Sequence, residues 1–319
     1  MHPTTLARRA ASALGVMILT LAGSVVHASR LAPAAARAPG DSSPSAAPRF
    51  RARPLASDAA LTVCPSGCPY ATIQSALDAA KPGDGIFVGN GVYPERLTLK
   101  TSVSIRGVDP TVTVIDGGQG GPVISIQQGV GATISGFRIT GGRAASGAGI
   151  YNQGALFLSD AQLDGNETTD PKAGFGGGLF NYGGSVTLSD VTIKGNKAEL
   201  GGGLLNAYGI ASLVRTTVEA NTAAQFGGGI FNGATARLNV DTLYLKDNDV
   251  GTGRGGGLYS AGFSYVQRST FSGNSSGENG GAVYQFGDVT ILSNSTLSGN
   301  RADFGGSAVY VNSGAMLIT

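Results

Sequence analysis

Histidine is almost absent from this chain. The two that occur, His2 and His27, both fall within the first 28 residues, which read as a removable leader. Without histidine in the mature chain, histidine-based triads, general bases and metal ligands are excluded together. The chain also has only 2 cysteines, too few for a structural zinc site.

Basic residues are too few and too unevenly placed for a nucleic-acid-binding protein. The formal net charge is +2 over the whole chain, but seven of the 22 basic residues lie before Ala60. From Leu61 onward there are 15 basic and 18 acidic residues, a net charge of −3. Because no basic stripe remains, we expect no nucleic-acid partner.

Residues 1–28 predict a secretory signal peptide. Arg8 and Arg9 give a positive start, residues 10–26 an apolar stretch, and Ala28 ends a small-residue cleavage site. Residues 29–60 are rich in Ala, Pro and Ser without apolar periodicity, which predicts a disordered linker. The mature protein is therefore expected to be secreted or held at a bacterial cell surface, with no transmembrane span.

Glycine is abundant, and much of it lies in a phrase that occurs seven times. From Gly147 onward the copies read GAGIYN, GGGLFN, GGGLLN, GGGIFN, GGGLYS, GGAVYQ and GSAVYV. The aliphatic residue of the phrase recurs at steps of 29, 25, 26, 28, 25 and 26 residues. Between the copies, apolar and polar residues alternate as in short β-strands. A period in this range predicts a repeat architecture.

An apolar residue three places before an asparagine recurs in phase with the glycine phrase. The six asparagines are Asn166, Asn196, Asn221, Asn248, Asn274 and Asn300. A unit of a few short strands cannot bury its apolar face alone, but stacked units can. If each unit is one turn of a parallel β-helix, with turns ~4.8 Å apart, the asparagines stack in an inward-facing amide ladder.

The glycine phrase combined with apolar-x-x-Asn resembles the repeats of the polymorphic outer membrane proteins and related bacterial surface β-helices, over about residues 150–319. Residues 62–118 are similar to the N-terminal part of pectin-lyase-like β-helix proteins. Both resemblances imply a right-handed parallel β-helix. We expect an all-β, single-stranded solenoid over residues 61–319, with a short N-terminal capping helix and a C-terminally incomplete last turn.

Residues 72–80 predict the capping helix, whose apolar face contains Ile73, Ala76, Leu77 and Ala80. Thr72 is placed to cap its first turn. The helix is expected to cover strand edges and core that the end of the coil would otherwise expose.

Cys64 and Cys68 lie in the sequence CPSGC. In an exported chain, a local disulfide is the default for such a pair. A redox motif is not expected, because three residues separate the cysteines.

Polysaccharide chemistry is the main enzyme hypothesis, since relatives of this fold cleave pectin. GVYPE at residues 91–95 resembles a motif of pectin methylesterases, but the aspartate motifs QDTL and DFIFG of that family have no match. A calcium-dependent lyase needs only carboxylates and a basic side chain. Asp160, Asp190 and Arg215 each stand six residues before a ladder asparagine. The two aspartates could hold Ca²⁺ with Arg215 as base; the alternative is a solvated charge ladder.

An aromatic file follows the aliphatic position of the phrase and suggests a binding surface. Its members are Tyr151, Phe180, Phe231, Tyr259, Tyr284 and Tyr310. Because neighbouring strand residues point to opposite faces, we expect an outward stripe that stacks on sugar rings or docks a protein. In the alternative, the rings stack inside the coil or serve only to stabilise its turns.

Two functions therefore remain open. The first is an exported, non-catalytic β-helix that acts in adhesion or surface interaction, with a polysaccharide or a cell-surface protein as partner and no cofactor. The alternative is a calcium-dependent, pectate-type lyase or another carbohydrate-active enzyme, for which Ca²⁺ is the cofactor.

Overall fold

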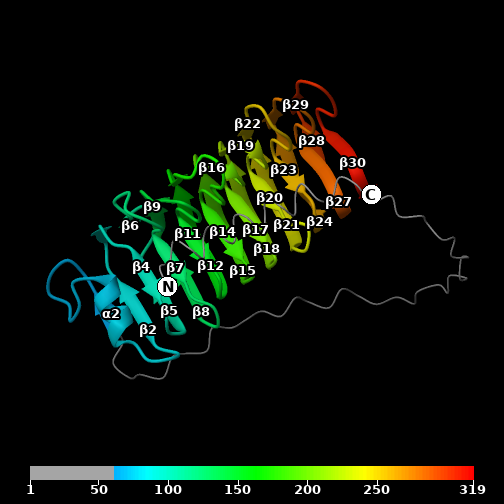
Figure 1. Ribbon diagram of the computed structural model, residues 1–319. Helices are drawn as coiled ribbons and strands as arrows, with labels where there is room; N and C mark the ends of the chain where they lie inside the picture. The colour runs from blue at the N-terminus through cyan, green and yellow to red at the C-terminus, as the bar shows by residue number, and fades with distance from the viewer. Residues whose placement is uncertain (1–60) are drawn as a thin grey trace, which may run out of the picture. The chain divides into compact units, whose positions relative to one another are not determined.

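The computed structural model describes residues 61–319, which form a right-handed parallel β-helix of about ten turns (Figure 1). The predicted leader, residues 1–28, and the predicted linker, residues 29–60, lie outside the described residues. In the described part, each strand pairs in parallel with its counterparts in neighbouring turns. The all-β solenoid predicted from the repeat is confirmed.

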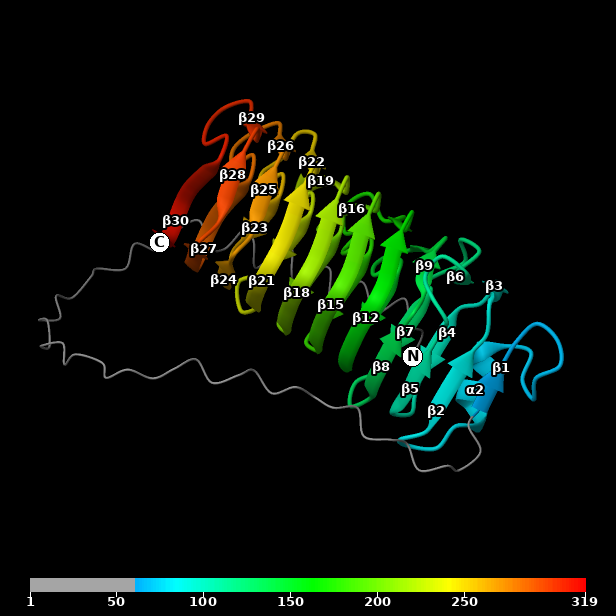
Figure 2. The same ribbon diagram turned by 180° about the vertical axis from the view of Figure 1, so that it is seen from behind.

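A full turn passes through four strand positions, which we number face 1 to face 4 in chain order. Face 1 contains β1 (Leu61–Val63), β2 (Gly85–Val88), β5 (Val103–Arg106), β8 (Gly131–Ser135) and β24 (Phe263–Gln267). Face 2 contains β3 (Gly91–Tyr93), β6 (Thr113–Asp116), β9 (Arg138–Thr140), β25 (Thr270–Ser272) and β28 (Thr296–Ser298). Four long strands, side by side in Figure 2, bend midway and belong to both faces: β12 (Ala155–Asp164), β15 (Ser185–Lys194), β18 (Ile210–Glu219) and β21 (Arg237–Lys246).

Face 3 is a separate seven-stranded sheet of short strands: β10 (Arg143–Ala144), β13 (Glu167–Thr168), β16 (Lys197–Leu200), β19 (Thr222–Phe226), β22 (Asp249–Val250), β26 (Ser275–Ser276) and β29 (Arg301–Ala302). Face 4 contains β4 (Leu97–Leu99), β7 (Ile124–Ile126), β11 (Ile150–Asn152), β14 (Leu179–Tyr182), β17 (Leu204–Ala207), β20 (Ile230–Asn232) and β23 (Leu258–Ser260). Two further strands run from face 4 into face 1: β27 (Val283–Ser293) and β30 (Val309–Ile318).

The hydrophobic core follows the axis of the coil and is built from the inward side of the strands. The aliphatic residue of the glycine phrase has no exposed surface in the copies at Leu179, Leu204 and Ile230. In β15, Val186 and Leu188 are buried while Thr187 between them is partly exposed. This alternation follows from the pleat of a strand, which sends successive side chains to opposite faces.

The six asparagines of the apolar-x-x-Asn pattern form the predicted ladder at the bend between faces 2 and 3. Nδ2 of Asn196 donates to Oδ1 of Asn221 at 3.0 Å, and Nδ2 of Asn221 donates to Oδ1 of Asn248 at 3.0 Å. The main-chain N–H of Asn196 donates to the same Oδ1 of Asn221 at 3.0 Å. Nδ2 of Asn196 also donates to the carbonyl of Leu163, the apolar anchor of the previous turn, at 3.1 Å. This contact explains why the anchor and the asparagine keep a fixed spacing.

A second ladder, not predicted from the sequence, lies at the bend between faces 4 and 1. It is formed by the asparagine that ends the glycine phrase: Asn152, Asn181, Asn206 and Asn232. Each Nδ2 donates to the next Oδ1, at 2.7, 2.8 and 3.0 Å. All four side chains are fully buried, so two independent rows of amides join these turns.

Glycine is required in the phrase for two reasons, which the second copy illustrates. Gly176 has a φ of 62°, in the left-handed region, and a Cβ there would lie 2.4 Å from the carbonyl oxygen of Leu179. A Cβ on Gly178 would lie 2.7 Å from the carbonyl oxygen of Gly203 in the next turn and 3.0 Å from Nδ2 of Asn196. The glycines therefore allow a tight bend and the close approach of neighbouring turns.

Helix α2 (Ile73–Ala79) lies at the N-terminal end of the coil (Figure 1). It buries Ile73, Ala76 and Leu77 against the end of the core. Thr72 is the N-cap, and its side chain accepts a hydrogen bond from the main-chain N–H of Ser75. The predicted helix and its cap are confirmed.

Glu95, the last residue of GVYPE, binds the first turn of this helix. Its Oε1 accepts from the main-chain N–H of Ile73 at 2.8 Å, and its Oε2 accepts from that of Gln74 at 2.9 Å. A carboxylate is favourable there, because the free N–H groups make the start of a helix electropositive. GVYPE therefore has a structural role in this chain: it fastens the cap to the first turns.

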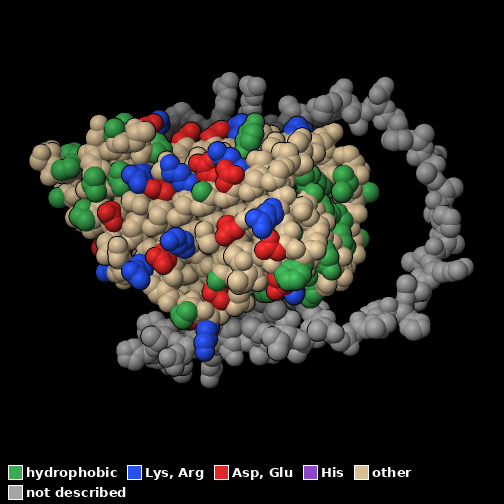
Figure 3. Space-filling view, turned by 90° about the horizontal axis from the view of Figure 1, so that it is seen from above, with side chains coloured by type: hydrophobic (Ala, Val, Ile, Leu, Met, Phe, Trp, Pro, Cys, Tyr) green, Lys and Arg blue, Asp and Glu red, His purple; other side chains and the backbone are tan. Residues whose placement is uncertain are grey.

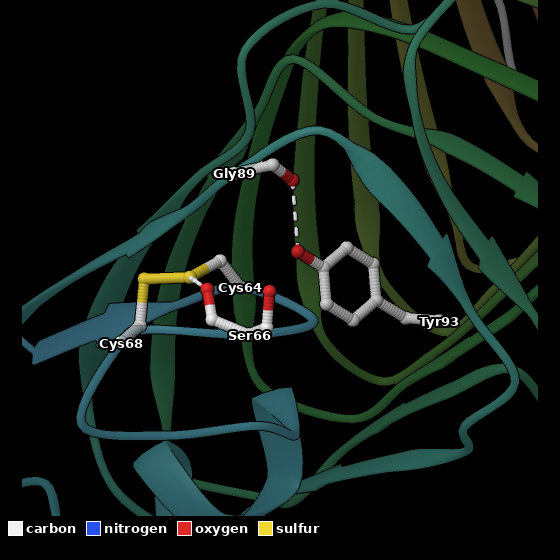
Figure 4. The surroundings of a disulfide bond; sticks show 5 residues. All are labelled: Cys64, Ser66, Cys68, Gly89 and Tyr93. Carbon is white, nitrogen blue, oxygen red and sulfur yellow. Dashed lines mark hydrogen bonds between the residues drawn. A yellow bond between two sulfur atoms is a disulfide. The ribbon is translucent and has the colours of Figure 1, made fainter.

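Cys64 and Cys68 form a disulfide in the loop that precedes α2, with their Cα atoms 5.5 Å apart (Figure 4). Close to it, the hydroxyl of Tyr93 donates to the carbonyl of Gly89 at 2.9 Å (Figure 4). The closed loop is short, so the disulfide contributes little by restricting the unfolded chain.

Replacing Asn221 with Ala should lower the free energy of unfolding by about 3 kcal/mol or more. The change leaves two donors of Asn196, its main-chain N–H and its Nδ2, without their acceptor inside the core. Urea unfolding followed by circular dichroism measures the effect. The neighbouring change Thr222→Ala removes an exposed side chain and should cost less than about 0.5 kcal/mol. Equal midpoints for the two variants would contradict a stabilising ladder.

Replacing Glu95 with Ala should loosen the cap by about 1 to 2 kcal/mol, because two main-chain donors of α2 lose their acceptor. Hydrogen exchange of residues 73–79 should quicken while exchange in β15 stays unchanged. Glu167→Ala, at an exposed site on face 3, serves as the control. If α2 keeps its full protection from hydrogen exchange in Glu95→Ala, Glu95 does not hold the helix against the first turns.

Candidate binding surfaces

The last four rings of the aromatic file form a stack on face 4, and Leu205 separates them from Tyr151 and Phe180. Phe231 and Tyr259 lie 4.9 Å apart between ring centroids with planes 2° apart. Tyr284 continues the stack at 5.1 Å and Tyr310 at 5.4 Å. The rings are not members of the central core cluster that contains their aliphatic neighbours. Strand alternation therefore predicts their direction correctly: they point away from the axis of the coil.

The prediction that these rings form an exposed stripe is wrong. Four of them are at most 4% exposed: Phe180, Phe231, Tyr259 and Tyr284. Only Tyr151 and Tyr310 keep partial exposure. A ligand therefore finds no continuous aromatic surface on face 4.

The rings are covered by the segment that leads from face 3 into the glycine phrase. The residue just before the phrase is Phe175, Leu200 or Phe226 in three of the turns. The ring of Phe175 lies 5.7 Å from that of Phe180, and the ring of Phe226 lies 4.8 Å from that of Tyr259. This segment and the aromatic file form a second, smaller core outside the main one. An apolar residue directly before the phrase was the sequence signal for it.

Arg254 takes the covering position one turn after Phe226. Its guanidinium lies 5.6 Å from the centroid of the Tyr284 ring, and it pairs with Glu278. Beneath this cover, burial strongly raises the pKa of the Tyr259 hydroxyl, because the phenolate would lose its hydration.

Asp160, Asp190 and Arg215 stack in successive turns at the bend between faces 1 and 2, as their spacing predicts. All three have positive φ angles, 46°, 58° and 45°, so the column is the bend position of the repeat. Nε of Arg215 donates to Oδ1 of Asp190 at 2.7 Å, and Nη2 of Arg215 donates to Oδ2 of Asp190 at 2.6 Å. These hydrogen bonds lower the pKa of Asp190 and raise that of Arg215.

This geometry does not fit the calcium-and-base arrangement considered for the column. An arginine that accepts a proton needs a lowered pKa, whereas Asp190 raises the pKa of Arg215. Ca²⁺ takes about six to eight oxygen ligands, but both oxygens of Asp190 already bind Arg215. Within residues 61–319, no three acidic, histidine or cysteine side chains gather closely enough to hold a metal ion. The contacts are those of a charge ladder, the alternative to the metal site.

A neighbouring column on face 2 alternates in sign. Asp164, Lys194, Glu219 and Lys246 occupy equivalent positions in β12, β15, β18 and β21. Nζ of Lys246 lies 2.9 Å from Glu219. Asp164 forms an ion pair at 2.6 Å with Arg138, which lies in the previous turn opposite Gln162 and outside this column. Figure 3 shows acidic and basic side chains intermingled on the face in view. Stacking of the turns therefore places opposite charges next to one another on this face and does not build a patch of a single charge sign.

A groove of about 520 Å³ lies on face 1, over β5, β8, β12 and β15. Its floor includes a file of outward side chains that oppose one another turn by turn: Ser104, Thr133, Phe157 and Thr187. Phe157 is 42% exposed. Sequence reasoning missed this surface because its polar positions look like ordinary solvent-facing strand residues. The one available signal was a phenylalanine within a file of hydroxyl side chains.

Comparisons with known proteins agree with the repeat. Residues 268–285 match the family model of the Chlamydia polymorphic membrane protein repeat. This match includes Asn274 of the ladder and the glycine phrase that starts at Gly280. No curated protein matches the chain.

Several solved structures of pectin methylesterases are similar to the chain. PemA from Erwinia chrysanthemi is 12% identical, covering 82% of this chain and 94% of its own, with a TM-score of 0.42. The Aspergillus niger enzyme in deglycosylated form is 14% identical over 83% of this chain and 86% of its own, with a TM-score of 0.41. The Yersinia enterocolitica enzyme is 12% identical over 78% and 94%, with a TM-score of 0.40.

Repeat and fold together define the class of this protein. It is a parallel β-helix protein that contains a repeat of the polymorphic membrane protein type. In the described part of the chain, no helix has the length and apolar character needed to cross a bilayer.

Tyr259 should make the protein sensitive to alkali. Its pKa is raised above the ordinary value of 10.0, so the stability it contributes is fully present below pH 10 and is lost as the pH rises further. Above pH 10, wild-type stability should fall by roughly 1 kcal/mol per pH unit more than that of Tyr259→Phe. Urea titrations from neutral pH to about pH 11.5 measure the difference. Tyr244→Phe, at an exposed site, should keep the wild-type profile; identical profiles for all three proteins would refute the assignment.

Proposed function

We propose that this chain is an exported, non-catalytic β-helix protein that acts in adhesion or surface interaction. The bidentate pairing of Arg215 with Asp190 carries the proposal. It occupies the column of the described turns in which two carboxylates stack near a basic side chain, and it engages both oxygens of Asp190 and the guanidinium of Arg215 with each other.

Two further observations support a role at a bacterial surface. The match of residues 268–285 is to a repeat of a membrane protein of Chlamydia, and residues 1–28 predict a signal peptide. We expect the protein to be secreted or held at the cell surface, with a polysaccharide or a cell-surface protein as its partner.

Face 1 supports a binding role better than face 4. The groove over β8 and β12 is open to solvent and lined by side chains that make no ion pairs. The aromatic file, by contrast, is occupied by the segment that covers it. If the protein binds a partner through its repeats, the groove on face 1 offers exposed hydroxyl and aromatic side chains that carry no charge.

A calcium-dependent lyase is the alternative, and one observation favours it: Asp160 stands one turn from Asp190. For such a lyase, Ca²⁺ would have to displace Arg215 from Asp190. Calcium would then raise the melting temperature, and polygalacturonate would yield an unsaturated product that absorbs in the ultraviolet.

We expect the purified protein to release neither that product from polygalacturonate, with or without calcium, nor methanol from methyl-esterified pectin. It should instead bind bacterial or host cells saturably. Asp190→Asn and Arg215→Gln should leave cell binding unchanged within about twofold, because both lie outside the groove. Turnover in the wild type that is lost in Arg215→Gln would establish the lyase and overturn the proposal.

A further inference from the structure

We propose that the groove on face 1 binds a neutral, linear polysaccharide that runs along the coil, with Phe157 as the platform for a sugar ring. This inference names the ligand of the surface-interaction function proposed above and rests on that function.

The groove exists because small side chains flank the outward-facing row of Ser104, Thr133, Phe157 and Thr187, which we call the hydroxyl file. Gly131, Ala155 and Ser185 occupy the same position in β8, β12 and β15, two residues before the file. In β18 this position is taken by Ile210, which is 48% exposed, and in β21 by Arg237. The groove is therefore a feature of particular turns, where the flanking side chain is too small to fill it.

The lining carries no ionisable side chain. It consists of glycine, alanine, serine, threonine, valine, leucine and a single phenylalanine. A polyanion such as polygalacturonate would need cationic partners in the groove to compensate for its lost hydration. Hydroxyl groups can both donate and accept, which matches the hydroxyls of an uncharged sugar.

Phe157 is the apolar contact within this polar lining. It lies between Thr133 of the previous turn and Thr187 of the next. Among the described residues no aromatic ring contacts it, in contrast to the stacked rings of face 4. An exposed ring between two hydroxyls offers the combination that a pyranose uses: an apolar face against the ring, and donors and acceptors at its edges.

A peptide fits this surface less well. Extended peptides bind sheets by adding a strand to an open edge, where main-chain groups are free. On face 1, β12 already pairs with β8 on one side and with β15 on the other. Only side chains face the groove, so a ligand must be recognised by hydroxyl and ring contacts.

The spacing of the turns also suits a polymer. Consecutive turns lie ~4.8 Å apart, comparable to the length of one sugar residue in an extended chain. A polysaccharide along the axis would therefore meet Ser104, Thr133, Phe157 and Thr187 with successive sugars.

The test is titration of the full chain with three soluble polysaccharides: laminarin and a neutral xylan as uncharged probes, and polygalacturonate as the anionic one. Calorimetry and affinity electrophoresis measure binding. We expect at least one neutral polymer to bind with little dependence on salt, and polygalacturonate to bind more weakly. Phe157→Ser should weaken binding about tenfold or more, because the ring contact is lost. Ala155→Tyr, which fills the groove, should weaken it as well.

Tyr244→Ser is the matched control, since Tyr244 is also an exposed aromatic residue, 55% exposed, but on the second half of β21. It should leave the affinity unchanged, and the melting curves of all variants should show that they fold. Equal binding by wild type and Phe157→Ser, or a preference for polygalacturonate that weakens with salt, would overturn the inference. Cell binding that persists equally in Phe157→Ser would retain the surface function and reject only this ligand site.

Discussion

The buried asparagine amide sets the register on which the rest of the structure depends. An amide has a carbonyl that accepts and an NH₂ group that donates, so identical side chains can bond one another indefinitely along an axis. Asn196 uses both ends, and its second hydrogen reaches the carbonyl of Leu163. Because slipping by one residue would bury a polar side chain without partners, the ladder penalises every other alignment of neighbouring turns.

Fixed register has a direct consequence for charged residues. Any position of the repeat meets its own equivalent ~4.8 Å away, and like charges at that distance repel. This repulsion is avoided in two ways. In one column the charges alternate in sign, as in Asp164, Lys194, Glu219 and Lys246. In the other, an arginine binds a carboxylate through two hydrogen bonds, as Arg215 binds Asp190. Carboxylates held in this way serve the stacking of turns. A carboxylate that is held by a cation in this way is not free to act as a catalytic acid or base.

The amide ladder, the capping helix and the stacked carboxylate column could be predicted because each depends on spacing along the chain. The burial of Tyr259 could not, because alternation determines which way a side chain points and not what another segment places over it. Here Phe226 covers the ring from the turn before. The second ladder was also missed, since its run of asparagines ends after four copies and is followed by Ser260 and Gln285. The role of Glu95 requires a helix more than 20 residues away in sequence to fold against it.

These constraints also limit where a repeat of this kind can bind a ligand. Face 2 carries the ion-pair columns, and the aromatic file of face 4 lies under the segment that leads into the glycine phrase. On face 1, at β8, β12 and β15, the outward positions need neither charge compensation nor cover, so small and hydroxyl side chains can occupy them. A ligand that repeats with the turns can then match them one by one. The same regularity that pairs opposite charges on face 2 places small and hydroxyl side chains one above another on face 1, which suits this face to a repeating, uncharged polymer.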